Sequence, residues 1–88
     1  MASLKELNKQ LKSMSEDAID AIGTLREILG QLEQLKEDQR ESFDNMPEGL
    51  QQSENGQNAE SRADQLDELF DTIESALDEL EAAEWEVE

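Results

Sequence analysis

Carboxylates are the side chains of this sequence that could do chemistry, and they are densest in its C-terminal third. Of the 24 acidic residues in the 88-residue chain, twelve lie between Glu60 and Glu88, where Arg62 is the only basic residue. On a helix of that length this is about one negative charge per 3.6 Å, close to the ~3.4 Å phosphate spacing of a DNA strand. Six of these acids recur at heptad spacing in two rows, which are Asp64, Asp71 and Asp78, and Asp67, Glu74 and Glu81. We expect both rows to lie on the outer face of a helix, away from its core.

Acid–base catalysis is not expected from these carboxylates. A carboxylate pair acts as acid and base only where a sheltered cleft gives its two members different environments. The sequence has no His, Cys or Tyr, so the usual general base, the thiolate nucleophile and the usual transition-metal ligands are missing. We therefore predict that the chain is not an enzyme and that it has no catalytic, cofactor-binding or metal-binding residues.

The acidic face can be interpreted in two ways. It can be a solvated surface that keeps a small protein soluble, or it can imitate a phosphate backbone and bind a basic protein. The formal net charge of −17 repels nucleic acid and anionic membranes. The predicted partner is therefore a basic protein, with no direct nucleic-acid contact and no membrane. The predicted partner-binding residues are the acids of the two rows: Asp64, Asp67, Asp71, Glu74, Asp78 and Glu81.

The N-terminal half of the chain has the pattern of one long helix. Its apolar residues repeat every seven positions in two rows, which are Leu4, Leu11, Ala18, Leu25 and Leu32, and Leu7, Met14, Ala21, Ile28 and Leu35. This a/d repeat predicts a helix over about 3–45 whose apolar seam faces another helix. Ile22 and Leu29 form a third row beside the seam, which is typical of a bundle rather than a two-stranded coil.

The ends of this helix and the connection after it can be read from capping and turn residues. Ser3 and Glu6 form a capping box at the start. Pro47 ends the helix, because the residue before a proline disfavours helical geometry. A polar loop is predicted over 46–57, and its Asn55-Gly56 pair is a strong turn signal.

A second helix is predicted over about 58–84, followed by an acidic tail at 85–88. Its two core rows are Ala59, Leu66, Ile73 and Leu80, and Ala63, Phe70 and Leu77, and its flanking row is Leu69, Ala76 and Ala83. The sequence therefore predicts one all-α domain over 1–88, an antiparallel helical hairpin. We expect two such hairpins to pair in a homodimeric helical bundle.

Self-association is expected at the N-terminal end of the long helix. The first helix is predicted to be about 15 residues longer than the second, which leaves an overhang without a partner. The apolar side chains of the overhang are Leu4, Leu7, Leu11 and Met14. A second chain would cover them, and its acidic tail could meet the basic residues Lys5, Lys9 and Lys12.

Trp85 is the only tryptophan, and it lies outside the predicted core rows. Two interpretations stay open for it. It can belong to a fraying terminus, or it can anchor in a pocket of a partner, as interface tryptophans often do.

The loop carries a resemblance to a known group of proteins. The residues from Phe43 to Gln51, FDNMPEGLQ, are followed by Ser53-Glu54-Asn55-Gly56 and the acidic helix from Ala59. Over about residues 37–82 this arrangement resembles small acidic helical proteins encoded by bacteriophages and prophages. That group has no settled activity, so the resemblance implies an all-helical fold and a phage context, and no functional residues.

These observations together predict a function class. We expect a non-enzymatic, protein-binding regulator or inhibitor, phage-encoded and DNA-mimic-like, that acts on a basic nucleic-acid-binding target as anti-CRISPR and anti-restriction proteins do. The alternative is a structural or adaptor coiled-coil homodimer whose acidity serves only solubility. No apolar run approaches the ~18 residues of a membrane span, so we expect a cytoplasmic protein, in the host cytoplasm if it is phage-encoded.

Overall fold

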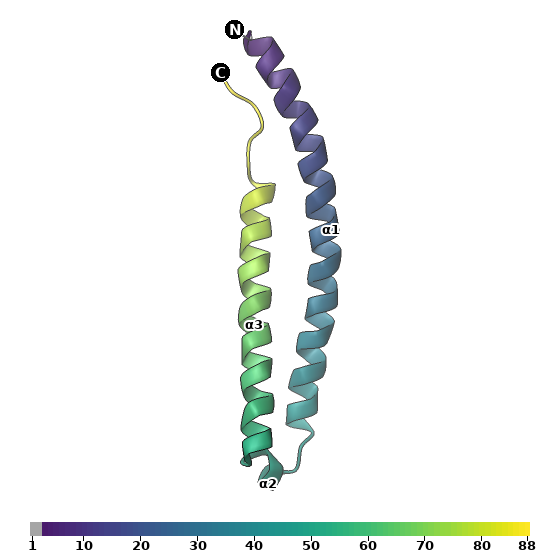
Figure 1. Ribbon diagram of the computed structural model, residues 1–88, viewed down its shortest axis with the longest axis vertical. Coiled ribbons are helices and arrows are strands. Elements are labelled where there is room, and N and C mark those ends of the chain that lie inside the picture. The colour runs from purple at the N-terminus through teal and green to yellow at the C-terminus, as the bar shows by residue number, and fades with distance from the viewer. Residues whose placement is uncertain (1–2) are drawn as a thin grey trace.

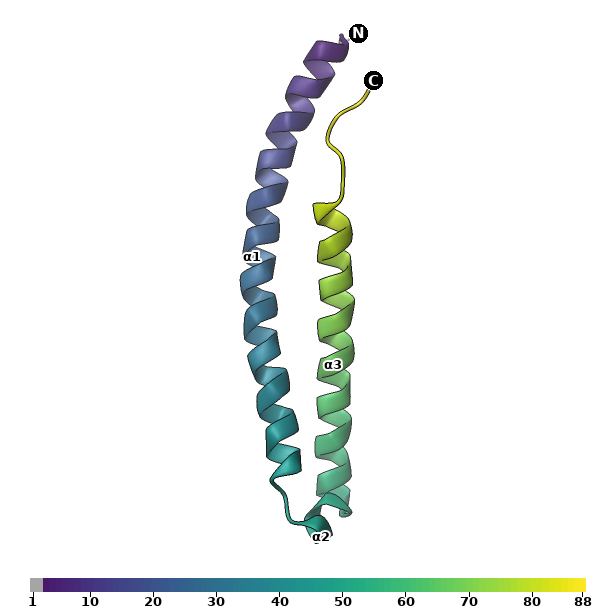
Figure 2. The ribbon, with the colours of Figure 1, turned by 180° about the vertical axis from the view of Figure 1, so that it is seen from behind.

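A computed structural model describes residues 3–88 as two long helices that lie side by side (Figures 1 and 2). Helix α1 spans Leu4–Asp44, α2 is the short helix Glu48–Gln51, and α3 spans Glu54–Glu81. α1 and α3 run antiparallel and form a rod of 69 × 17 × 15 Å. The structure thus confirms the all-α class and the helical hairpin within the described residues.

The start of α1 follows the predicted capping box. The Ser3 hydroxyl accepts a hydrogen bond of 3.2 Å from the backbone N–H of Glu6, which satisfies one donor that the helix itself leaves free. The helix ends at Asp44, and Asn45 donates its backbone N–H to the carbonyl of Glu41. Pro47 then makes the bend that leads into α2.

The connection differs from the predicted loop over 46–57. α3 begins at Glu54, four residues before the expected start, because Ser53 caps it and accepts a 3.2 Å hydrogen bond from the N–H of Gly56. Asn55 and Gly56 therefore lie in the first turn of a helix rather than in a reverse turn. Gly56 is buried, and a Cβ there would clash with the backbone carbonyls of Leu50 and Gln51. The glycine is needed for the close approach of α2, not for a turn.

The core lies between α1 and α3. The two rows predicted for α3 face it for most of their length: Ala59, Ala63, Phe70 and Leu77 are buried, and Leu66 and Ile73 are partly buried beside the core. The prediction is wrong for Leu80, the last residue of its row, which is 48% exposed near the C-terminal end of α3. From α1, the buried residues are Leu29 and Leu32, with Ile22 partly buried beside them. The Lys36 ammonium lies 4.3 Å from the centre of the Phe70 ring, which it covers at the edge of the core.

One of the two seam rows predicted for α1 is not in the core. The row from Leu7 to Leu35 is exposed, with Met14 at 55% and Leu35 at 57%. The reason is geometric, since α1 carries three adjacent apolar rows and one partner helix covers only two of them. α3 packs on the Ile22–Leu29 row and on Leu32, while Leu25 in the row of Leu32 stays 39% exposed.

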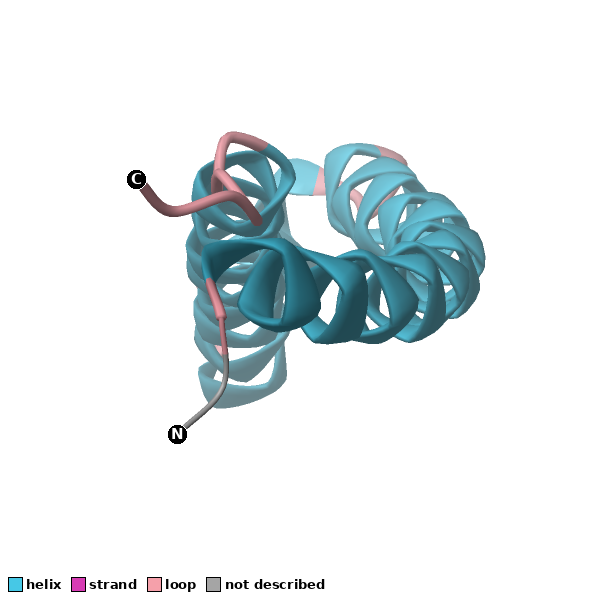
Figure 3. Cartoon of the chain, turned by 90° about the horizontal axis from the view of Figure 1, so that it is seen from above, coloured by secondary structure: helices cyan, strands magenta, loops and turns pink. Residues whose placement is uncertain are grey.

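The far end of the rod holds both termini (Figure 1). α3 stops at Glu81, three residues before the predicted end, and residues 82–88 continue as a non-helical C-terminal segment alongside α1. Viewed along the rod, α1 bows and its first turns lean across the end of α3 (Figure 3). Nowhere along residues 3–88 does a helix have the length and apolar character needed to cross a membrane.

Candidate functional site

The two predicted acidic rows lie along one edge of the hairpin, beside the core rather than far from it. Arg26 of α1 donates to Asp78 at 2.8 Å and to Glu81 at 2.7 Å. These bonds tie the C-terminal end of α3 to the middle of α1. The acids of both rows lie outside the core, as predicted, but four of them are not free, because two arginines of α1 reach across the interface to them.

A second arginine of α1, two heptads further along the helix, bridges two acids of α3 in the same way. Arg40 donates to Asp64 and Asp67, each at 2.8 Å. Hydrogen bonds from Arg26 to Glu81 and then to Asp78 raise the pKa of its guanidinium above its ordinary value. The carboxylates of Asp64 and Asp67 likewise raise the pKa of Arg40.

Arg26, Arg40 and their four acids make up what we name the charged edge. Both arginine side chains are about one-third exposed, at 35% and 34%. Exposed ion pairs of this kind are screened by salt and individually weak. Their role is to fix the register and rotation of α3 against α1.

Asp71 and Glu74 occupy the middle of the charged edge without an arginine. Along α3 they lie one heptad from the acids that Arg26 binds and one heptad from those that Arg40 binds. The residue of α1 halfway between the two arginines is Glu33. Neither acid forms an ion pair with the residues that the structure describes. Within residues 3–88 no acidic cluster has a geometry that could hold a metal ion.

The acidic surface that remains free is on the outer side of α3. Several exposed acids of the chain make no ion pair with any described residue, and we name the four of them that lie in the second half of α3 the outer acids: Glu68, Asp71, Glu74 and Glu79. Since α3 stops at Glu81, its ten acids over 28 residues give about one charge per 4 Å of helix. This spacing is wider than the one predicted for a helix that continued through the tail, and two arginines offset part of the charge.

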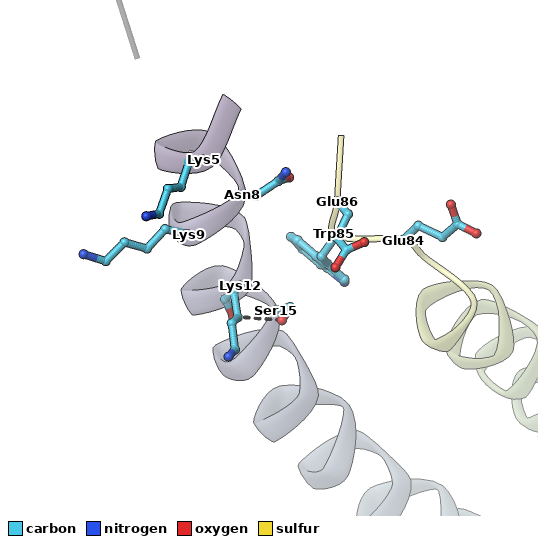
Figure 4. A pocket seen from close by; sticks show the side chains of 8 residues that line it. All are labelled: Lys5, Asn8, Lys9, Lys12, Ser15, Glu84, Trp85 and Glu86. Atoms are coloured by element: carbon cyan, nitrogen blue, oxygen red, sulfur yellow. Dashed lines mark hydrogen bonds between the residues drawn. The ribbon is translucent and has the colours of Figure 1, made fainter. Parts of the chain in front are cut away.

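Trp85 packs within its own chain. It is partly buried, and its ring extends from the C-terminal segment towards α1, near Asn8 and Ser15 (Figure 4). Asn8 holds the segment in place, because its amide donates to the carbonyl of Val87 at 3.1 Å and accepts from the Val87 N–H at 2.9 Å. The segment is therefore held beside α1 rather than loose, and Trp85 lines an open groove between the segment and α1.

The basic end of α1 meets the acidic tail of the same chain. Lys5, Lys9 and Lys12 line an open groove with Glu84 and Glu86. The side chains of Lys5 and Lys9 project to the other side of the helix from the tryptophan ring (Figure 4). These lysines make no ion pair with Glu84 or Glu86 in the part of the chain that the structure describes, so the two charged ends share a groove without a direct bond.

The predicted overhang is only partly covered. The C-terminal segment runs beside it, and Leu11 is partly buried. Leu4, Leu7 and Met14 stay exposed at 50%, 42% and 55%. These three side chains stay uncovered because α3 ends before it reaches them.

Sequence reasoning missed the two arginines that organise the charged edge. A signal was present, because one heptad row of α1 contains Lys5, Lys12, Ile19, Arg26, Glu33 and Arg40. This row holds four of the seven basic residues of the chain. A cationic row on one helix and an acidic row on the next indicate opposite sides of a shared edge.

Comparison with known proteins gives no family. No protein-family model matches the chain, and neither the curated proteins nor the solved structures contain a match.

Proposed function

We propose that this protein is a non-enzymatic regulator or inhibitor that binds a basic, nucleic-acid-binding protein through the outer side of α3. The observation that carries the proposal is the set of outer acids, which are exposed and make no ion pair with the described residues. They belong to a chain with a net charge of −17 and a rod 69 Å long. A basic groove that accepts a nucleic-acid backbone could accept this surface instead.

The charged edge has a definite part in this proposal. Arg26 and Arg40 engage Asp64, Asp67, Asp78 and Glu81, four of the six acids predicted to bind a partner. Those four hold α3 in place, while Asp71 and Glu74 and their outer neighbours face the target. Each outer contact is small and screened, so the acids must act together.

The resemblance of the loop to phage and prophage proteins gives the proposal a biological setting. In that setting the target is a cytoplasmic host defence protein that handles nucleic acid, as in anti-restriction or anti-CRISPR inhibition. The protein would act without a cofactor and without touching nucleic acid itself.

Affinity capture with matched charge variants tests the proposal. The first variant carries Glu68→Gln, Asp71→Asn, Glu74→Gln and Glu79→Gln, which neutralise the outer acids. The second carries Glu16→Gln, Asp20→Asn, Glu27→Gln and Glu41→Gln, which remove the same charge from exposed positions of α1. Immobilised wild-type chain and the α1 variant should capture the same nucleic-acid-binding protein from nuclease-treated bacterial lysate, and the outer-acid variant should not. Equal capture by both variants, or none by the wild type, would overturn the proposal.

A second candidate function is favoured by the exposed apolar row of α1. A helical adaptor would use that row for assembly, and its acidity would serve solubility alone. Salt separates the two candidates, because an electrostatic complex weakens steeply with ionic strength and an apolar one does not.

A further inference from the structure

The exposed apolar rows of the two helices lie on the same edge of the hairpin. In α1, the row from Leu7 to Leu35 lies beyond the Leu25–Leu32 row, on the side away from Arg26 and Arg40. In α3, the row of Leu69, Ala76 and Ala83 lies beyond the Leu66–Ile73 row, on the side away from Asp67 and Glu81. Because Arg26 and Arg40 bridge to the acids of α3, both charged rows mark one edge. The two apolar rows therefore form the opposite edge, which we name the apolar edge.

The apolar edge is large for a protein of this size. Four of its α1 side chains are between 42% and 57% exposed, and Leu69 of α3 is 48% exposed. The accessible surface of the chain is 6864 Å², against about 5200 Å² for a compact monomer of its mass. The excess is larger than the roughly 600–1000 Å² that each partner contributes to a stable protein interface.

We propose that the apolar edge pairs with the same edge of a second copy, antiparallel, about a two-fold axis beside Ala21. The spacing in the α1 row carries this proposal, because it reads almost the same in both directions: Leu7, Met14, Ala21, Ile28, Leu35. An antiparallel copy sets Leu7 against Leu35 and Met14 against Ile28. Ala21 meets its own equivalent at the axis, as the self-complementary interface of a two-fold dimer requires.

This arrangement also covers the overhang of α1. The N-terminal turns of each copy lie beside the second half of the row in the other copy, where Ile28 and Leu35 are exposed. Small Ala21 at the centre lets the two helices approach closely, and the larger side chains on either side fill the space. The pairing leaves the charged edge and the outer acids open, so it does not rest on the proposed function.

Cysteine cross-linking tests the proposed register, and the natural chain has no cysteine that would interfere. Under mild oxidation Ala21→Cys should give a disulfide-linked dimer, since a disulfide requires Cα atoms within about 7 Å. Met14→Cys and Ile28→Cys should each stay unlinked alone, because antiparallel pairing separates each from its own equivalent by about 21 Å. A variant with both cysteines should link. Gly23→Cys on the exposed outer face of α1 is the negative control.

The oligomeric state gives the second readout. Sedimentation equilibrium at tens of micromolar should give twice the 10.0 kDa chain mass for the wild type. Ile28→Lys on the apolar edge should give a single-chain mass with helicity retained, whereas Ile19→Lys, at a still more exposed isoleucine beside the charged edge, should stay dimeric. A single-chain mass for the wild type, or linking of Met14→Cys alone as efficiently as Ala21→Cys, would overturn the proposal.

Discussion

Glu33 interrupts a ladder of ion pairs that is otherwise regular. Arg26 and Arg40 each bridge two acids of α3, and Glu33 lies halfway between them in the same row, opposite the level of Asp71 and Glu74. The raised pKa of Arg26 has a simple consequence for pH. The contribution that the charged guanidinium makes to stability is present at neutral pH and is lost as pH rises through that raised value, far into alkali.

Replacing Glu33 by lysine should complete the ladder. We expect Glu33→Lys to raise the melting temperature at low salt by roughly 2–5 °C, the size of an exposed ion-pair effect in a chain this small. Glu27→Lys is the control, because it changes net charge equally at an exposed position on the outer side of α1. Calorimetry that finds the same rise for both variants would show that net charge, and not position, sets the effect.

Two glycines of this chain should respond oppositely to the same substitution. A methyl group at Gly56 would meet the backbone of Leu50 and Gln51, whereas nothing lies within 4 Å of one at Gly30. We expect Gly56→Ala to lower the free energy of unfolding by about 1–3 kcal/mol, as overpacking does. Gly30→Ala should raise it by about 1 kcal/mol, the difference in helix propensity. Urea unfolding measures both, and a stabilising Gly56→Ala would contradict the packing of α2 on α3.

At the scale of the elements, the C-terminal segment depends on one side chain of α1. Asn8 makes both hydrogen bonds to Val87, so Asn8→Ala should release the segment while α1 stays helical. Trp85 reports on this directly, because it is the only tryptophan. Acrylamide quenching of its fluorescence should rise towards that of free tryptophan, and Gln10→Ala on another face of α1 should leave it unchanged. Unaltered quenching in Asn8→Ala would mean that other contacts hold the segment.

The heptad periodicity predicted the two long helices well, but it did not predict correctly which rows of α1 pack against α3. The heptad rows gave two helices and the two core rows of α3, because burial against one neighbour demands that spacing. On α1 the a/d repeat assigned the Leu7–Leu35 row to the seam, whereas α3 covers the neighbouring Ile22–Leu29 row instead. The start of α3 was missed because Asn55-Gly56 is a turn signal as well as an acceptable first turn, and the Ser53 cap decided the outcome.

The C-terminal segment and the charged edge could not be predicted for a different reason. Residues 82–88 have no periodicity that fixes their path, and their position follows from a contact with Asn8, 79 residues away from Val87 along the chain. The ion pairs of Arg26 span 52 and 55 residues and depend on the register of the hairpin. Such contacts exist only once the two helices have been aligned.

At the scale of the whole molecule, the rod has three surfaces with different properties. The charged edge aligns the two helices, the apolar edge is available to a second copy, and the outer side of α3 presents acids that no described residue neutralises. The apolar edge lies opposite the charged edge, so a second copy bound there need not disturb the outer acids, two of which, Asp71 and Glu74, lie between the acids that Arg26 and Arg40 bind. In the function that we propose, the outer acids imitate a nucleic-acid backbone for a basic protein.

The most direct test is competition between this protein and DNA for the captured partner. Anisotropy of a short labelled duplex bound to that partner should fall as the wild-type chain is added, and the effect should weaken from about 50 to about 200 mM salt. The α1 charge variant should compete like the wild type, and the outer-acid variant should not compete. A complex that holds duplex and chain together, with an affinity indifferent to salt, would contradict the account.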